Sequence, residues 1–211
     1  MKKILKLILF MIIILIILYI INCFRNFLII NKLSEISNTH NSSNNYKILQ
    51  NSFSIDNENT SWEVLAEYYF KDNIYLYKNN TVLTRNSNKE TTKYGVWHDT
   101  ISNEHIEFLY DNENNLIKDE LIDKENLSSP LDNIFYNNNN FSNILKSIIT
   151  KENGNYKIIT YYKDIKEINY INYKTGLIEK KFIIHNTSTY SLTNTYEENI
   201  VTNEILEKPN F

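Results

Sequence analysis

The chain has 211 residues, a formal charge of −3 and an aromatic content of 13%. The aromatic content excludes an intrinsically disordered chain, and the near balance of charge, without a basic stripe, excludes a nucleic-acid-binding surface. The single cysteine, Cys23, excludes an internal disulfide framework.

An apolar run covers residues 4–24 and follows two basic residues at the N-terminus. Its length is about the 20 residues that cross a bilayer as a helix. Lys2, Lys3 and Lys6 lie before or near the start of this run, so the positive-inside rule places the N-terminus in the cytoplasm. We therefore predict a single-pass cell-membrane protein, with an uncleaved anchor and its C-terminal domain outside the cytoplasm.

Two alternatives concern the end of this run. A cleaved signal peptide needs small residues before the scissile bond, and the stretch from Leu18 to Cys23 has none. A lipid on Cys23 would need a small residue before it, where the chain has Asn22. Both features favour an uncleaved anchor and an unmodified cysteine.

Composition divides the rest of the chain. Residues 1–33 are expected to hold the anchor and a helix extension, and residues 34–45, rich in Ser, Asn and Thr, are expected to form a linker. The segment 46–211 is then a β-rich extracytoplasmic domain, and a fragment starting near Tyr46 is expected to fold by itself.

Alternating polarity predicts the first strands. Residues 62–70 place Trp62, Val64 and three further apolar side chains on one face. Residues 74–78 and 81–85 flank Asn79-Asn80, which predicts a tight hairpin, because Asn tolerates a positive φ. Residues 94–98 and 104–110 form a further pair.

The pattern changes at residues 141–149, where apolar side chains fall at i, i+3, i+4, i+7 and i+8, which predicts an amphipathic helix. Four strands follow, at residues 156–162, 166–173, 178–185 and 188–196, with connections so short that they must be antiparallel. The predicted fold class is α+β, with an N-terminal transmembrane helix and short helices covering a curved antiparallel sheet, or half-barrel.

Several short motifs are similar to those of a known group. They are Asn153-Gly154-Asn155-Tyr156-Lys157-Ile158, then 170–177, and the ending 201–205 with Pro209. They resemble uncharacterised membrane-anchored proteins of low-GC Gram-positive bacteria in the lipoprotein-carrier (LolA-like) superfamily. The resemblance implies a half-barrel whose apolar concavity holds an acyl chain or lipid in some members. It carries over no functional residue.

Metal-ligand residue types occur together only around His98-Asp99 and Glu104-x-x-Glu107, which encloses His105. If His98 and His105 faced each other near Glu107, a metal site would be conceivable, but ordinary polar decoration of strand ends is the favoured interpretation. No Gly-x-Ser-x-Gly elbow is present, and three glycines leave no phosphate-binding loop. We therefore predict no enzyme and no cofactor.

The candidate ligand-binding residues are the apolar side chains best placed to line a cavity, although each is more simply a core residue: Trp62, Trp97, Phe108, Phe141 and Leu145. We predict a membrane-anchored binding module that holds an apolar or lipid-like ligand in the concave face of the sheet. The alternative is a non-enzymatic envelope interaction or sensor module with a filled core. A cavity of several hundred cubic ångströms would favour the first, and an exposed apolar patch or strand edge the second.

Overall fold

The computed structural model describes residues 2–41, 45–111, 116–120, 134–136 and 141–209. The helices in this described part are α1 (Lys2–Asn41) and α2 (Phe141–Leu145). The strands are β1 (Asn45–Asp56), β2 (Ser61–Lys71), β3 (Ile74–Arg85), β4 (Asn88–Asp99), β5 (Glu104–Tyr110), β6 (Leu116–Glu120), β7 (Ser147–Glu152), β8 (Asn155–Tyr161), β9 (Ile165–Asn172), β10 (Ile178–His185) and β11 (Ser188–Glu198).

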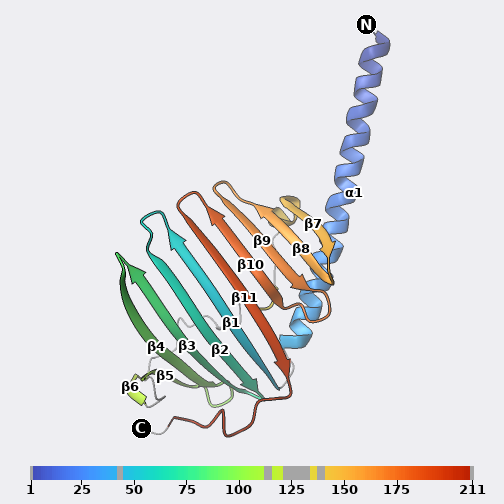
Figure 1. The fold of residues 1–211 in the computed structure, drawn as a ribbon. Helices are drawn as coiled ribbons and strands as arrows, with labels where there is room; N and C mark the ends of the chain where they lie inside the picture. The colour runs from blue at the N-terminus through green and yellow to red at the C-terminus, as the bar shows by residue number, and fades with distance from the viewer. Residues whose placement is uncertain (1, 42–44, 112–115, 121–133, 137–140, 210–211) are drawn as a thin grey trace.

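All eleven strands form one curved sheet in the order β6-β5-β4-β3-β2-β1-β11-β10-β9-β8-β7 (Figure 1). Neighbours are antiparallel throughout, and β1 joins β11, so the first and last strands of the chain meet in the middle of the sheet. The predicted α+β fold, with a long apolar helix followed by a curved antiparallel sheet, is confirmed. The main helical cover is the second half of α1 rather than a separate short helix.

α1 has two different halves. Its first half projects away from the sheet, and its second half packs along it (Figure 1), where Ile30 and Leu33 are buried among side chains of β7 to β11. Residues 34–41 are helical, where composition predicts a linker. The reason is a close packing contact: a Cβ added to Gly176 would lie 2.6 Å from the Cα of Ser37, and Ser37 is buried.

We call the sheet face that contacts α1 the helix face. It carries two clusters of buried side chains: one includes Ile158 and Ile171 with Ile30 of α1, and the other includes Tyr46 and Ile48 with the first two residues of the segment 134–136. Phe135 of this segment bridges to Leu177 at the start of β10. Alternate residues of the central strands therefore form the core on this face.

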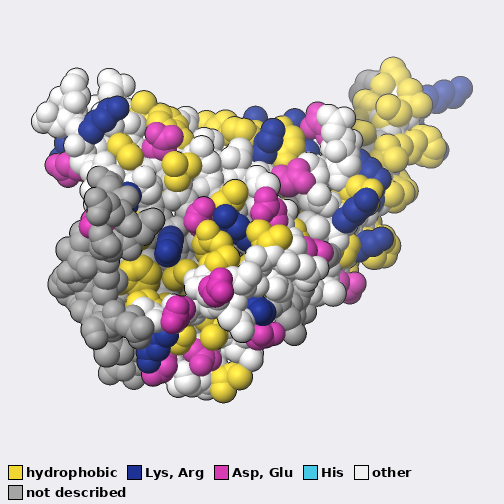
Figure 2. Space-filling model, turned by 60° about the horizontal axis from the view of Figure 1, so that its bottom comes forward, with side chains coloured by type: hydrophobic (Ala, Val, Ile, Leu, Met, Phe, Trp, Pro, Cys, Tyr) yellow, Lys and Arg dark blue, Asp and Glu magenta, His cyan; other side chains and the backbone are white. Residues whose placement is uncertain are grey.

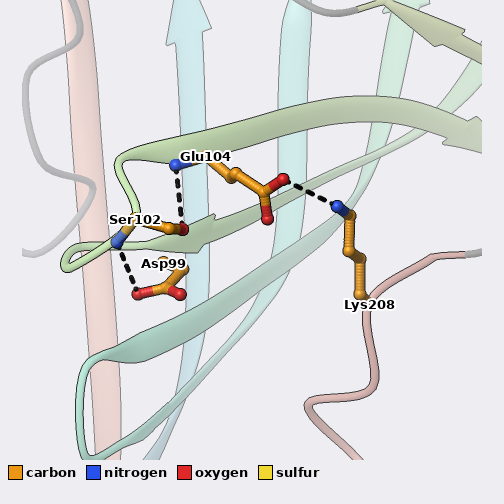
Figure 3. Close-up of polar contacts among 4 residues, drawn as sticks. All are labelled: Asp99, Ser102, Glu104 and Lys208. Carbon is orange, nitrogen blue, oxygen red and sulfur yellow. Dashed lines mark hydrogen bonds and ion pairs between the residues drawn. The ribbon is translucent and has the colours of Figure 1, made fainter.

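We call the opposite side the tail face, because the C-terminal residues 199–209 pack on it. Val201 and Leu206 lie in a cluster with side chains of β3, β4 and β5. The indole Nε1 of Trp97 donates a hydrogen bond to the carbonyl of Leu206, at 2.9 Å. Lys208 forms an ion pair with Glu104 at the start of β5, with an N–O distance of 2.9 Å (Figure 3).

The predicted hairpin at Asn79-Asn80 is wrong. Both residues lie in the middle of β3, which runs unbroken and pairs with β2 on one side and β4 on the other. The turns lie on either side of β3 instead, where Asp72 and Asn86 have φ values of 56° and 49°. A turn at Asn79 would have left half of the long strand β2 without hydrogen-bonding partners on the side away from β1.

The predicted helix over residues 141–149 is also wrong beyond Leu145. Ser147 begins β7, which pairs with β8 through Thr160, and its hydroxyl also contacts the Thr160 hydroxyl at 2.9 Å. Ile148 is exposed and Ile149 is buried, which is the alternation of a strand. A short apolar run fits both the repeat of a helix and the alternation of a strand, so it cannot decide between the two. The pairs β4–β5 and β8 to β11 form as predicted.

Candidate ligand cleft

The apolar residues predicted to bind a ligand do not line one cavity. Trp62 lies on the helix face of β2 and is partly exposed, whereas Trp97 and Phe108 lie in the buried cluster on the tail face. Leu145 is exposed in α2, and the side chain of Phe141 lies outside the described part. Their use as ligand contacts remains a hypothesis.

Trp97 and Phe108 have clear packing roles. The Phe108 ring lies directly over Gly95, its cross-strand neighbour, and a Cβ at Gly95 would come within 2.3 Å of that ring. An aromatic ring that covers a glycine in this way stabilises a strand pair. The sequence could not separate these residues from the helix face, because β4 is buried on both faces around Trp97.

The metal-ligand residue types do come close to one another. His98 and His105 are directly opposite on β4 and β5, so they share the helix face, and their ring centroids are 5.6 Å apart. His105 Nε2 lies 3.3 Å from a carboxylate oxygen of Glu107. Even so, the described residues include no group of three or more His, Cys, Asp or Glu side chains that could hold a metal ion.

A cleft lies instead between the second half of α1, the start of β8 and the end of β9. Tyr156, near the start of β8, and Tyr173, directly after β9, line it on the side of the sheet. The volume of the cleft is about 180 Å³. The α1 residues that line it are spaced to fall on one side of the helix. The full lining is Leu28, Ile29, Lys32, Leu33, Ile36, Tyr156 and Tyr173.

Local turns position the two tyrosines. Asn153 and Gly154 have φ values of 48° and 82°, and this turn starts β8 so that Tyr156 faces α1. Tyr173 follows β9 directly, and Asn172 accepts a hydrogen bond from the backbone N–H of Lys174, at 2.9 Å. This turn returns the chain past Tyr173 towards α1.

Lysines surround the apolar lining. Lys32 lines the cleft itself, and the ammonium groups of Lys151 and Lys174 lie 5.0 Å and 6.0 Å from the centre of the Tyr173 ring. These are cation–π distances. The cleft therefore combines an aliphatic floor with a positively charged rim, which suits a ligand with an apolar chain and a negative head.

The cleft also lies near the end of the apolar run of α1. Leu28 and Ile36 follow the run's last residue, Phe24, along the same helix. At 1.5 Å per residue they lie roughly 6 Å and 18 Å beyond it. The lining of the cleft thus starts within about one helical turn of the end of the apolar run.

Away from the cleft, tyrosine side chains line the helix face of β1 to β3. Burial raises the pKa of Tyr46 and of Tyr68 well above the ordinary value, so both hydroxyls stay protonated. The Tyr68 hydroxyl donates to Gln50 at 3.3 Å, and the Tyr68 and Tyr77 rings are 4.8 Å apart. These contacts fill and order this part of the face.

Sequence reasoning missed the cleft. It noted a helix extension after the anchor but assigned no binding role to the residues of this extension. The signal that could have found it is the spacing of Leu28, Lys32 and Ile36, one helical turn apart, next to the apolar run.

No family model and no curated protein matches the chain. A solved DUF1329 family protein from Desulfovibrio piger is similar over 85% of this chain and 95% of its own, with a TM-score of 0.33 and 9% identity. A LolA superfamily protein from Nitrosomonas europaea is similar over 85% and 96%, with a TM-score of 0.36 and 6% identity. Similarity at this level assigns no ligand and no residue roles.

Proposed function

We propose that this protein is a membrane-anchored binding module, without enzymatic activity, that holds an apolar, lipid-like chain in the cleft between α1 and the ends of β8 and β9. One observation carries the proposal. The aliphatic floor of the cleft, from Leu28 to Ile36, continues the helix whose preceding residues form the apolar run. A chain that leaves the bilayer beside α1 would meet this floor directly.

The anchor is supported by the surface of α1. Among the described residues it is the one helix long and apolar enough to cross a membrane, and no residue in its most apolar part is buried. Figure 2 shows this end as hydrophobic side chains with basic ones at the tip. So large an exposed apolar surface needs an apolar surrounding, and the basic end suits the cytoplasmic side.

The dimensions limit the ligand. The cleft of about 180 Å³ is smaller than the roughly 300–1,000 Å³ of a pocket for a drug-sized molecule. It therefore suits a single acyl chain or part of one, with the head at the lysine rim. In this proposal the ligand lies beside α1, near the edge of the sheet, rather than in the middle of a hollow half-barrel.

Fatty-acid binding tests the proposal. The full chain in detergent micelles is titrated with a fluorescent fatty acid, and native mass spectrometry looks for co-purified lipid. Leu28→Gln should weaken binding about tenfold or more, because a chain that buries against Leu28 loses apolar contact. Leu65→Gln is the matched control, since Leu28 and Leu65 are 52% and 51% exposed and Leu65 lies on the tail face of β2. Equal affinities for the two variants would contradict the cleft as the site.

A second candidate function rests on the tail face. Ile148, Ile159, Ile168 and Phe182 are directly opposite one another across β7 to β10 and form an apolar row. Ile184, also on this face, is exposed. Such a row suits a flat protein partner, so an interaction module is the alternative. Ile184→Asp should abolish self-association of the full chain in analytical ultracentrifugation if that partner is a second copy.

A further inference from the structure

The outer edge of β7 is tied to α1 by side chains at the end of the apolar run. Asn26 Nδ2 donates to the carbonyl of Ser147 at 2.9 Å, and the Arg25 guanidinium donates to the carbonyl of Ile149 at 3.1 Å. Asn26 is buried. These bonds satisfy edge carbonyls and also fix the start of β7 at the level of helix residues 25 and 26.

That level can be placed relative to a bilayer. The apolar run, residues 4–24, rises about 31 Å as a helix, which matches a hydrocarbon core of about 30 Å. If the run spans the membrane, Arg25 and Asn26 lie where hydrocarbon meets the headgroups. The backbone atoms bonded to them must then lie in the headgroup layer, because hydrogen bonds allow no more than about 3 Å of separation.

The side chains at this level have the composition of a membrane interface. Leu145 and Ile148 flank Ser147 and are 39% and 53% exposed, and Lys146 between them is also exposed. The backbone N–H of Tyr161 donates to the carbonyl of Lys146 at 3.4 Å, and Tyr161 is 46% exposed. Tyrosine and lysine both prefer the headgroup region, with apolar stems pointing inward.

We propose that this membrane corner, residues 145–148 together with Tyr161, inserts into the headgroup layer of the bilayer that α1 spans. In Figure 1 the α2–β7 junction lies beside α1, at the end of the sheet from which the first half of the helix projects. The corner makes a second contact with the membrane, so the sheet cannot swivel about a single anchor. It also holds the mouth of the cleft at a constant height above the lipid. The inference rests on the proposed anchor.

Site-specific fluorescence tests the membrane corner in the full chain. Cys23→Ser removes the native thiol, and Ile148→Cys or Tyr161→Cys then carries an environment-sensitive nitrobenzoxadiazole label. Ile101→Cys is the control, because Ile101 is 75% exposed in the turn between β4 and β5, at the other end of the strands. The proteins are reconstituted into vesicles of phosphatidylcholine and phosphatidylglycerol.

We expect severalfold weaker quenching by aqueous iodide at positions 148 and 161 than at 101. We also expect quenching at these two positions, and not at 101, by lipids with a spin label near the headgroup. All three replaced side chains are exposed. Because two positions of the membrane corner are labelled separately, a local disturbance by one label cannot by itself explain the result. Protein that floats with the vesicles but shows equal iodide quenching at all three positions would overturn this inference alone. Protein that does not float with the vesicles would overturn the anchor and this inference together.

Discussion

The two halves of the sheet are covered on opposite faces. Strands β7 to β11 are covered on the helix face by the second half of α1, whereas β3 to β5 are covered on the tail face by residues 199–209. The two ends of the chain thus supply two unrelated covers. Each cover buries the sheet face that it contacts, and around Trp97 strand β4 is buried on both faces.

The covers differ in how they are held. α1 contributes Ile30 and Leu33 from a regular helix, and Arg25 and Asn26 bind the edge of β7. The C-terminal segment, residues 199–209, has no helix or strand. It is held by the buried side chains of Val201 and Leu206 and by single hydrogen bonds, such as those of the Leu206 carbonyl with Trp97 and of the Val201 carbonyl with Asn45. Loss of the helix should therefore cost more free energy of unfolding than loss of the tail contacts.

The largest effect is expected from removing the helical cover. A fragment that begins at Arg25 keeps it, and a fragment that begins at Tyr46 loses Ile30 and Leu33, whose burial is worth about 3–6 kcal/mol together. This approaches the whole stability of a typical domain. Guanidinium unfolding followed by circular dichroism should show a cooperative transition for the first fragment and a weak or absent one for the second. Equal midpoints would restore the independent domain that the composition predicts.

A point substitution sharpens the same comparison. Leu33→Ala should lower the free energy of unfolding by about 2–5 kcal/mol, through lost burial and a cavity. Leu28→Ala on the same helix is the control and should cost less than about 1 kcal/mol, because Leu28 is exposed. Both are measured by chemical denaturation in detergent. Similar losses for the two variants would mean that the contact between α1 and the sheet is not a core.

The sequence predicts the strands where alternation and turns agree. Residues 155–198 form an antiparallel meander as predicted, because their connections are short and contain Asn, Gly or Asp. Prediction from the sequence fails where one local signal fits two different structures. Asn79-Asn80 resembles a turn, and residues 144–149 fit a helix as well as a strand, and only the pairing with a distant strand decides between them.

The candidate site was harder to predict than the fold. Cavity-lining side chains depend on which face of each strand is covered, and by what. Trp97 and Phe108 are buried under the C-terminal segment, which follows them in sequence by about a hundred residues. The cleft depends on α1 packing beside Tyr156, a contact between segments that are far apart in the sequence.

A smaller effect is expected at the tail cover. Leu206→Ala should lower the free energy of unfolding by about 2 kcal/mol, near the low end for such changes, because an irregular segment can partly collapse into the space. The emission of Trp97 should shift to the red, since Leu206 shields its ring. Ile205→Ala is the neighbouring control at an exposed position. If Ile205→Ala shifted the emission to the red as much as Leu206→Ala does, the C-terminal segment would not pack on Trp97 as described.

The smallest effect is expected at the turn between β4 and β5, next to the tail contact (Figure 3). Asp99 accepts hydrogen bonds from the backbone N–H groups of Ile101 and Ser102, at 2.9 Å and 3.4 Å. These donors hold the pKa of Asp99 below its ordinary value of 3.8. A depressed carboxylate pKa means that the folded state binds the proton more weakly than the unfolded state. Its stabilising contribution is therefore complete above the unfolded pKa and is lost as the pH falls through the folded pKa.

Asp99→Asn removes this pH-dependent contribution while it keeps a side-chain oxygen that can accept the same bonds. The variant should melt slightly below the unsubstituted chain at pH 7, and the difference in Tm should shrink as the pH falls through the folded pKa of Asp99. Other carboxylates titrate in both proteins, so the difference between the two melts isolates Asp99. Thermal melts in detergent across this range provide the measurement. A difference in Tm that stays constant down to pH 2 would show that the charge of Asp99 does not stabilise the turn, and that the β4–β5 end depends on the packing of the tail.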